Sequence, residues 1–370
     1  MSAAIAITAT ASLLCASLDR IAFSKALARL KHLIQARAAL PVLEAVLIET
    51  AGDHLTLTAT DLTVFVRVIV PAAVTSPGAL LVPLRRLVEL SRNRARQLDL
   101  AGATVTLGAA RHRLAVLDTS TFPAVPTPGG EVLATLLRPT LARALAATTY
   151  AMSTDETRPH LAALFIERRE DELRLVATDG HRLALARVAD TGPDSTLLVG
   201  RRAIEEVERL VAAPGGLVRI QRDGDRVWFV SGEEWVSGKV VDATFPSYEQ
   251  VIPEHFAGRV TFPTKDLVEV VRTVAPKGTP GVRLALLRDA GRIVLTVDDG
   301  DGNLTEATVS AAFEGELPAA IGVNALYLRE LLGALSGDDR TVTIALNGEL
   351  DPLRVDGAGG TTAVVMPLRV

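Results

Sequence analysis

The chain has 370 residues, of which 48% are hydrophobic, and a formal net charge of −4 at pH 7. This length allows two or three domains with a hydrophobic core in each. Because the net charge is negative, the chain as a whole lacks the basic character that usually marks a DNA-binding domain. No apolar run approaches the roughly 20 residues of a membrane span. The single cysteine, Cys15, excludes an internal disulfide and indicates a reducing compartment, the cytoplasm.

The first third of the chain predicts an ordered series of elements. The uncharged run Ser2–Leu18 lacks the basic start of a secretory signal and indicates a strand or loose extension. A helix is predicted at Leu18–Leu33, followed from Leu40 by two apolar runs that a polar turn joins and that lead to Asp61. A second helix is predicted at Pro83–Arg94, before two more strand-like runs.

The same order recurs twice more along the chain. The paired apolar runs start again at Arg158 and Thr279 and lead to Asp179 and Asp299, so the aspartates recur at intervals of about 120 residues. Such a period marks tandem copies of one structural unit. The matching helices are predicted at Leu141–Met152, Arg201–Val211, Thr264–Val274 and Asn324–Leu335. We therefore predict three similar domains, at residues 1–129, 130–256 and 257–370.

Strand signals dominate between the predicted helices. Turn dipeptides occur where hairpins need them, at Gly52-Asp53, Asp223-Gly224, Ala290-Gly291 and Asn347-Gly348. Alternation of apolar and polar residues, as in 54–58 and 341–345, indicates antiparallel sheets with one covered face. The helices would cover that face, so the predicted fold class is α+β, with two helices packed on antiparallel sheets in each domain.

Catalytic and cofactor signals are thin. The sequence has no P-loop and no Gly-x-Gly-x-x-Gly after a strand, and its six histidines lack metal-ligand spacing. The acidic run Asp298–Asn303 lacks the glycine and the terminal glutamate of a calcium loop, and a solvated hairpin turn is the favoured interpretation. We predict no catalytic residues, no metal site and no cofactor. An enzyme with an unrecognised site is the least favoured alternative.

Two segments stand out against this background. In Val176–Ala184 (VATDGHRLA), His181 and Arg182 follow a glycine at a strand end, which predicts either projecting functional side chains or a hairpin tip with solvated charges. The C-terminal Val364–Val370 (VVMPLRV) is either a last core strand or an apolar lining that a partner peptide covers. The pattern by itself leaves both alternatives open.

Several phrases in the same order resemble one known family. ATDGHRLA, FPSYEQVIP (Phe245–Pro253), VVMPLRV, LPVLEAVLIE (Leu40–Glu49), TATDL (Thr58–Leu62) and GVRL (Gly281–Leu284) resemble the bacterial DNA polymerase III sliding clamp, the beta subunit, over nearly the whole chain from about Leu14. The resemblance implies the DNA clamp fold and a head-to-tail homodimer closed into a pseudo-sixfold ring. It also implies a non-catalytic processivity factor of the polymerase III holoenzyme that encircles double-stranded DNA without reading its sequence.

The resemblance implies two sites. The first is a groove between domains two and three that binds short linear motifs of the polymerase III alpha subunit, the clamp loader, other polymerases and repair proteins. By motif, this groove comprises Leu161, Thr178, Gly180, His181, Arg182, Leu183, Pro246, Val251, Val364, Met366, Pro367, Leu368 and Arg369. The second is a DNA-contacting set that comprises Arg37, Arg158, Arg201 and Arg202.

The chain also departs from the family pattern. Pro159 and His160 follow Arg158 where an aromatic pair is common, Gln250 replaces a basic residue, and Pro276–Pro280 (PKGTP) replaces a polar loop near the expected dimer contact. An extension of about a dozen residues precedes the first strand. These departures leave two alternatives: a diverged second clamp copy that resists a clamp-directed inhibitor, and a monomeric peptide-binding adaptor.

Overall fold

The computed structural model describes residues 13–34, 40–276, 278–279, 281–298, 303–335 and 341–369. These residues form two compact units. One unit comprises the described part of Met1–Thr135 with Glu205–Lys239, and the other comprises Leu136–Ile204 with the described part of Val240–Val370. The division into three domains at 1–129, 130–256 and 257–370 stays a prediction.

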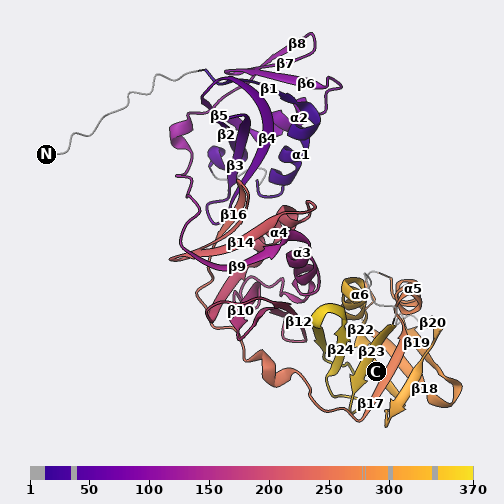
Figure 1. Cartoon of the computed structure of the whole chain (residues 1–370). Coiled ribbons are helices and arrows are strands. Elements are labelled where there is room, and N and C mark those ends of the chain that lie inside the picture. The colour runs from indigo at the N-terminus through magenta and orange to yellow at the C-terminus, as the bar shows by residue number, and fades with distance from the viewer. Residues whose placement is uncertain are drawn as a thin grey trace. The chain divides into compact units, whose positions relative to one another are not determined.

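The first unit is built on one antiparallel sheet of 12 strands. Its main path runs β8-β7-β6-β1-β4-β16-β15-β14-β9, and β2, β3 and β5 extend from β4. The strands are β1 (Cys15–Asp19), β2 (Ala45–Ala51), β3 (His54–Thr60), β4 (Phe65–Ser76), β5 (Ala79–Pro83), β6 (Gln97–Ala101), β7 (Thr104–Leu107), β8 (Ala110–Arg113), β9 (Glu131–Leu137), β14 (Leu217–Asp223), β15 (Arg226–Ser231) and β16 (Glu234–Lys239). The expected antiparallel pairing is confirmed (Figure 1).

A small aromatic cluster lies where β4 and β16 pair. Trp228 and Trp235 meet edge to face with ring centroids 5.1 Å apart, and both pack with Phe65 in one buried cluster. The guanidinium of Arg67 lies over the Trp235 ring, 5.2 Å from its centroid. Because such contacts add to the energy of area burial, this cluster strengthens the junction of the two strands.

The second unit contains two antiparallel sheets. The larger has nine strands in the order β13-β10-β11-β12-β25-β24-β23-β17-β21, and the smaller has four in the order β20-β19-β18-β22. The larger sheet comprises β10 (Ala163–Arg169), β11 (Glu172–Thr178), β12 (Arg182–Ala189), β13 (Ser195–Gly200), β17 (Gly258–Pro263), β21 (Ala312–Gly315), β23 (Thr341–Leu346), β24 (Leu353–Gly357) and β25 (Thr361–Val365). The smaller comprises β18 (Gly281–Leu287), β19 (Arg292–Asp298), β20 (Leu304–Ser310) and β22 (Ala320–Asn324).

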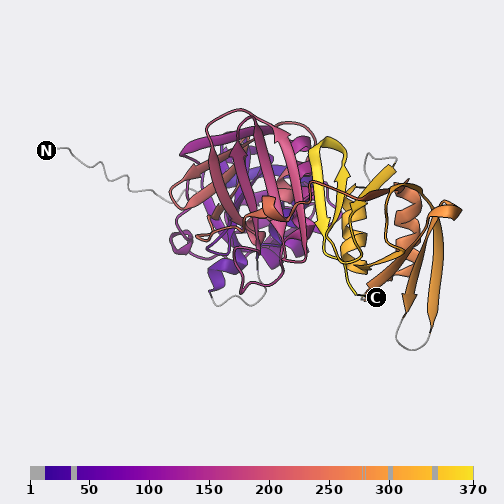
Figure 2. The same ribbon diagram turned by 90° about the horizontal axis from the view of Figure 1, so that it is seen from below.

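The six predicted helices are all present in the described residues. They are α1 (Arg20–Leu30), α2 (Leu84–Ser91), α3 (Arg138–Ala146), α4 (Arg201–Val211), α5 (Thr264–Val274) and α6 (Ala325–Leu335), and six short 3-10 turns accompany them. These turns are η1 (Pro41–Glu44), η2 (Thr119–Thr121), η3 (Thr149–Ala151), η4 (Tyr248–Val251), η5 (Arg288–Ala290) and η6 (Ala358–Gly360). The helices α5 and α6 lie side by side against strands of the second unit (Figures 1 and 2). No helix in the described residues is both long and apolar enough to cross a membrane.

Local chemistry explains where the helices begin. The Asp19 side chain caps α1 by accepting a hydrogen bond from the Ala22 amide at 2.8 Å, so Leu18 belongs to β1 and not to the helix. The predicted bounds of α3, Leu141–Met152, were wrong by several residues. Pro139 lies at the start of α3, where its fixed φ favours the first helical turn, and the β-branched pair Thr148-Thr149 follows the end of the helix.

The repeat is visible in two equivalent turns. Thr60 Oγ1 donates to the Val64 carbonyl, and Asp61 Oδ1 accepts from the Thr63 and Val64 amides at 3.0 and 2.7 Å. Thr178 and Asp179 make the same set of bonds around Gly180. The central residue has positive φ in both turns, 79° at Leu62 and 94° at Gly180. The third aspartate, Asp299, lies outside the described residues.

A test of the second unit's packing uses two glycines with similar backbone angles. Gly315 has φ 70° and pairs with Gly258, and a side chain at Gly315 would overlap the Ala257 carbonyl. Gly291 has φ 61°, and its nearest neighbour would be the Ala311 carbonyl oxygen at 3.8 Å. We expect Gly291→Ala to lower the free energy of unfolding by about 1–2 kcal/mol through backbone strain alone. Gly315→Ala should cost about 1–3 kcal/mol more. Urea unfolding followed by circular dichroism measures both, and equal losses would contradict this packing.

Candidate functional site

The candidate site is an apolar groove with a volume of about 240 Å³ in the second unit. Four segments form it: the β11–β12 hairpin with its turn at 179–181, the strand β25 with Met366 after it, residues 246–251 with the 3-10 turn η4, and residues 160–161. Strand pairing aligns the first two, because β12 and β25 are neighbours with Leu183 opposite Val364. Backbone hydrogen bonds therefore hold these two segments of the groove together.

Most of the residues predicted for the groove converge on it. The ten that line it are Leu161, Thr178, Gly180, His181, Arg182, Leu183, Pro246, Val251, Val364 and Met366. Pro367, Leu368 and Arg369 do not line it. The chain turns away there, since the Leu368 amide donates to the Gly322 carbonyl at 2.8 Å and joins β22.

Sequence reasoning missed three lining residues: His160, Ser247 and Tyr248. Ser247 and Tyr248 belong to the FPSYEQVIP phrase, so the signal was present, and His160 precedes the predicted Leu161.

The groove floor is a small hydrophobic cluster. Val176, Leu183, Leu185, Tyr248 and Val364 are all buried in it. Phe165 and Phe245 pack against this cluster and stack with ring centroids 4.8 Å apart. Two exposed apolar side chains stand above it, Val251 and Met366, which are 52% and 40% exposed. Apolar side chains left in water beside an apolar hollow are typical of a docking site for another apolar group.

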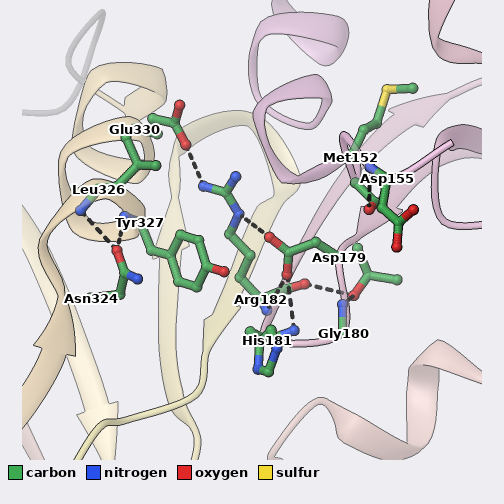
Figure 3. A network of polar contacts seen from close by, with 12 residues as sticks. Met152, Asp155, Asp179, Gly180, His181, Arg182, Asn324, Leu326, Tyr327 and Glu330 are labelled. Carbon is green, nitrogen blue, oxygen red and sulfur yellow. Dashed lines mark hydrogen bonds and ion pairs between the residues drawn. The ribbon is translucent and has the colours of Figure 1, made fainter. Parts of the chain in front are cut away.

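Arg182 lines the groove, but its guanidinium is held by carboxylates (Figure 3). Nε donates to Asp179 Oδ2 at 2.9 Å and Nη1 donates to Glu330 Oε2 at 2.5 Å, while the Arg182 side chain is 8% exposed. The guanidinium carbon also lies 4.3 Å from the centroid of the Tyr327 ring on α6. The Asn324 side chain caps this helix, accepting from the Leu326 and Tyr327 amides. The charge of Arg182 is thus balanced inside the protein, and its side chain links the hairpin turn to α6.

A second polar network fixes the opposite wall. The Tyr248 hydroxyl donates to Glu167 Oε2 at 2.7 Å. Arg174 pairs with Glu249 on the same 3-10 turn at 2.9 Å. These bonds tie η4 to the strands β10 and β11, so the wall that carries Val251 is held in place from behind.

The predicted DNA-contacting arginines occupy different environments. Arg158 is 47% exposed in its side chain and pairs with Asp155 at 2.9 Å. Arg201 donates to the Met152 and Ser153 carbonyls, so its guanidinium organises that segment of backbone. Arg202 is partly exposed beside it at the start of α4. Arg37 lies outside the described residues.

Among the described residues, no group of three or more His, Cys, Asp or Glu side chains could hold a metal ion. Burial raises the pKa of Tyr248 to about 12, with a further rise from its bond to Glu167. Burial likewise raises the pKa of Tyr150 and of Tyr327, the two rings beside Arg182.

Comparisons with known proteins agree along nearly the whole chain. Two family models match, "DNA polymerase III beta subunit, N-terminal domain" over residues 15–126 and "DNA polymerase III beta subunit, central domain" over residues 135–247. The beta sliding clamp of Caulobacter vibrioides is 32% identical over 382 aligned residues, which cover 96% of this chain and 99% of that protein.

Solved structures give the same result. A crystal structure of the beta sliding clamp from C. crescentus superposes with a TM-score of 0.86 at 30% identity, covering 97% of this chain and 100% of that chain. A sliding clamp from Bartonella birtlesii, crystallised bound to griselimycin, superposes with a TM-score of 0.87 at 27% identity, covering 96% of this chain and 100% of that chain.

The tyrosines provide a pH test of the packing of the second unit. The chain has three tyrosines, and the pKa of each is raised in the folded state. The unfolded value is about 10. The stability linked to these phenols is therefore fully present below about pH 10 and is lost as the pH rises through the folded values. We expect phenolate absorbance at 295 nm to appear near pH 10 in denaturant and at clearly higher pH in the native protein. A native titration that matched the denatured one would show that the phenols are solvated.

Proposed function

The chain belongs to the DNA polymerase III beta subunit family, the beta sliding clamps, and we propose that it works as a closed ring around duplex DNA that binds partner proteins in its groove. The protein is a DNA polymerase processivity clamp, a non-catalytic subunit of the holoenzyme. One observation carries the proposal for the groove. Ten residues chosen by family motif, from segments up to 205 positions apart, line one apolar cavity.

The groove suits a short linear peptide with spaced apolar side chains. An apolar side chain that entered the cavity would cover Leu183 and Val364 and leave water, a gain of about 1.5–3 kcal/mol for each fully buried side chain. Met366, half-exposed and unbranched, can adapt its shape to different ligands. His160, His181 and Ser247 supply polar atoms at the lining that can orient the peptide. The partners we propose are the polymerase alpha subunit, the clamp loader, other polymerases and repair proteins.

The ring and its contact with DNA are proposed on charge and symmetry. Two chains arranged head to tail, each with three similar domains, would make a closed pseudo-sixfold ring in which both ends of each chain contact the other chain. Arg158 and Arg202, which retain exposed surface, would attract phosphates without reading sequence, as a sliding contact requires. Arg201 would act indirectly by holding the 152–153 backbone. Such a ring would work in the cytoplasm. Nothing in the comparisons favours an inhibitor-resistant second copy or a monomeric adaptor.

The groove is tested with a single added charge. Met366→Glu would place a carboxylate in the apolar hollow, where a peptide must exclude water from it. We expect the dissociation constant of a labelled peptide with a glutamine and two spaced apolar residues to rise at least about tenfold. Fluorescence anisotropy gives the affinity.

A matched control separates this effect from charge alone. Leu217→Glu adds the same charge at a side chain that is 54% exposed in the other compact unit. Its peptide affinity should equal that of the wild type. Wild-type affinity in Met366→Glu would place the peptide elsewhere, and no binding by the folded wild type would mean that the groove serves different ligands.

Ring closure is tested by mass in solution. Gel filtration with light scattering should give twice the 39.1 kDa of the chain. A mass equal to one chain, with peptide binding retained, would support the monomeric adaptor instead.

A further inference from the structure

The second unit contains another cavity, which differs from the peptide groove because two arginines line it. It has a volume of about 300 Å³, and α3, β12 and the segment from η6 into β25 form its walls. Thr140, Arg143, Arg187 and Thr361 are the polar side chains among its lining residues. The cavity shares no lining residue with the peptide groove. Its size lies at the lower end of the range of about 300–1,000 Å³ for ligand pockets, which suits a small group.

The cavity has an excess of positive charge. Two guanidiniums line it, and none of the lining residues carries a carboxylate. Arg143 is exposed and makes no side-chain hydrogen bond or ion pair with another described residue. An arginine whose side chain makes no bond with another described residue has its donors available to an incoming anion.

Neighbouring side chains hold Arg187 in position but do not engage all of its hydrogen-bond donors. Its Nη1 donates to Thr362 Oγ1 at 3.3 Å. Its Nε lies 3.5 Å from Glu172 Oε2, and Arg174 shares this carboxylate oxygen, also at 3.5 Å. These contacts engage Nη1 and Nε of Arg187 and do not use its Nη2 donors. The contacts also restrain the side chain, so less entropy is lost when it binds a ligand.

Two glycines with positive φ lie next to this part of the cavity. Gly359 and Gly360 have φ values of 67° and 79°, and a Cβ at Gly360 would lie 3.3 Å from the Arg187 carbonyl oxygen. Gly359 lines the cavity and places no side chain in it, whereas Gly360 brings bare backbone close to β12. The hollow next to the guanidiniums therefore stays open on this side.

We propose that this cavity binds a phosphate group. Planar guanidiniums match phosphate oxygens with paired, charge-assisted hydrogen bonds, and the Thr140 hydroxyl can donate to a remaining oxygen. The phosphate can come from a free diphosphate or from the backbone of duplex DNA. Phosphate binding in this cavity does not depend on the peptide groove. If the phosphate belongs to duplex DNA, the proposal rests on the proposed DNA-encircling function.

Calorimetric titration of the full chain with inorganic pyrophosphate tests the first source. We expect saturable binding in the wild type that weakens about tenfold or more in Arg143→Gln and in Arg187→Gln. Arg219→Gln removes an exposed arginine of the other unit and should bind pyrophosphate like the wild type. Arg143→Gln should keep the wild-type melting temperature and groove-peptide affinity, which shows that the fold is intact.

The second source is tested with a duplex oligonucleotide over a range of salt concentrations. If pyrophosphate does not bind, the DNA affinity of Arg143→Gln should fall, and its log–log salt slope should shrink by about one relative to the wild type. Arg219→Gln should leave both unchanged. If Arg143→Gln changes neither pyrophosphate binding nor the DNA salt slope, the proposal is overturned. Loss of peptide binding in an intact dimer would instead count against the groove and leave the phosphate proposal standing.

Discussion

The groove depends on the buried charge of Arg182. Its guanidinium is withdrawn from water between Asp179, Glu330 and the Tyr327 ring. A charge removed from water is stable only where opposite charges and hydrogen bonds replace the lost solvent, and breaking such a pair costs about 3–5 kcal/mol. The carboxylates therefore fix where the side chain of Arg182 lies. That placement in turn fixes the hairpin turn against α6.

This arrangement explains why an arginine can line an apolar groove. A free guanidinium there would bind any passing carboxylate, and the groove would select ligands by charge. With its charge balanced internally, Arg182 contributes its stem to the lining and leaves selection to shape and apolar contact. The wall formed by η4 is also balanced inside the protein. Glu167 and Arg174 pair with the polar side chains of η4, while Val251 of the same turn lines the groove.

Much of this could be predicted from the sequence because it is local or repeated. The bounds of α4 and α5 were predicted as observed, and the Thr-Asp turns follow from short-range side-chain bonds. The start of α3 was missed, although Pro139 in the first helical turn marks it. The partner of Arg182 could not be predicted, since Glu330 lies 148 residues away and no spacing rule joins them. The second cavity, between α3, β12 and the segment from η6 into β25, could not be predicted either, because its arginines and glycines come from separate segments that share no motif.

The distribution of aromatic residues has a practical consequence. Both tryptophans of the chain, Trp228 and Trp235, belong to the first compact unit, whereas all three tyrosines belong to the second. Each unit therefore carries its own chromophore. Indole emission reports on the first unit and phenol absorbance reports on the second, without any label. Whether the two units melt together or in sequence can then be read from the unmodified protein in a single experiment.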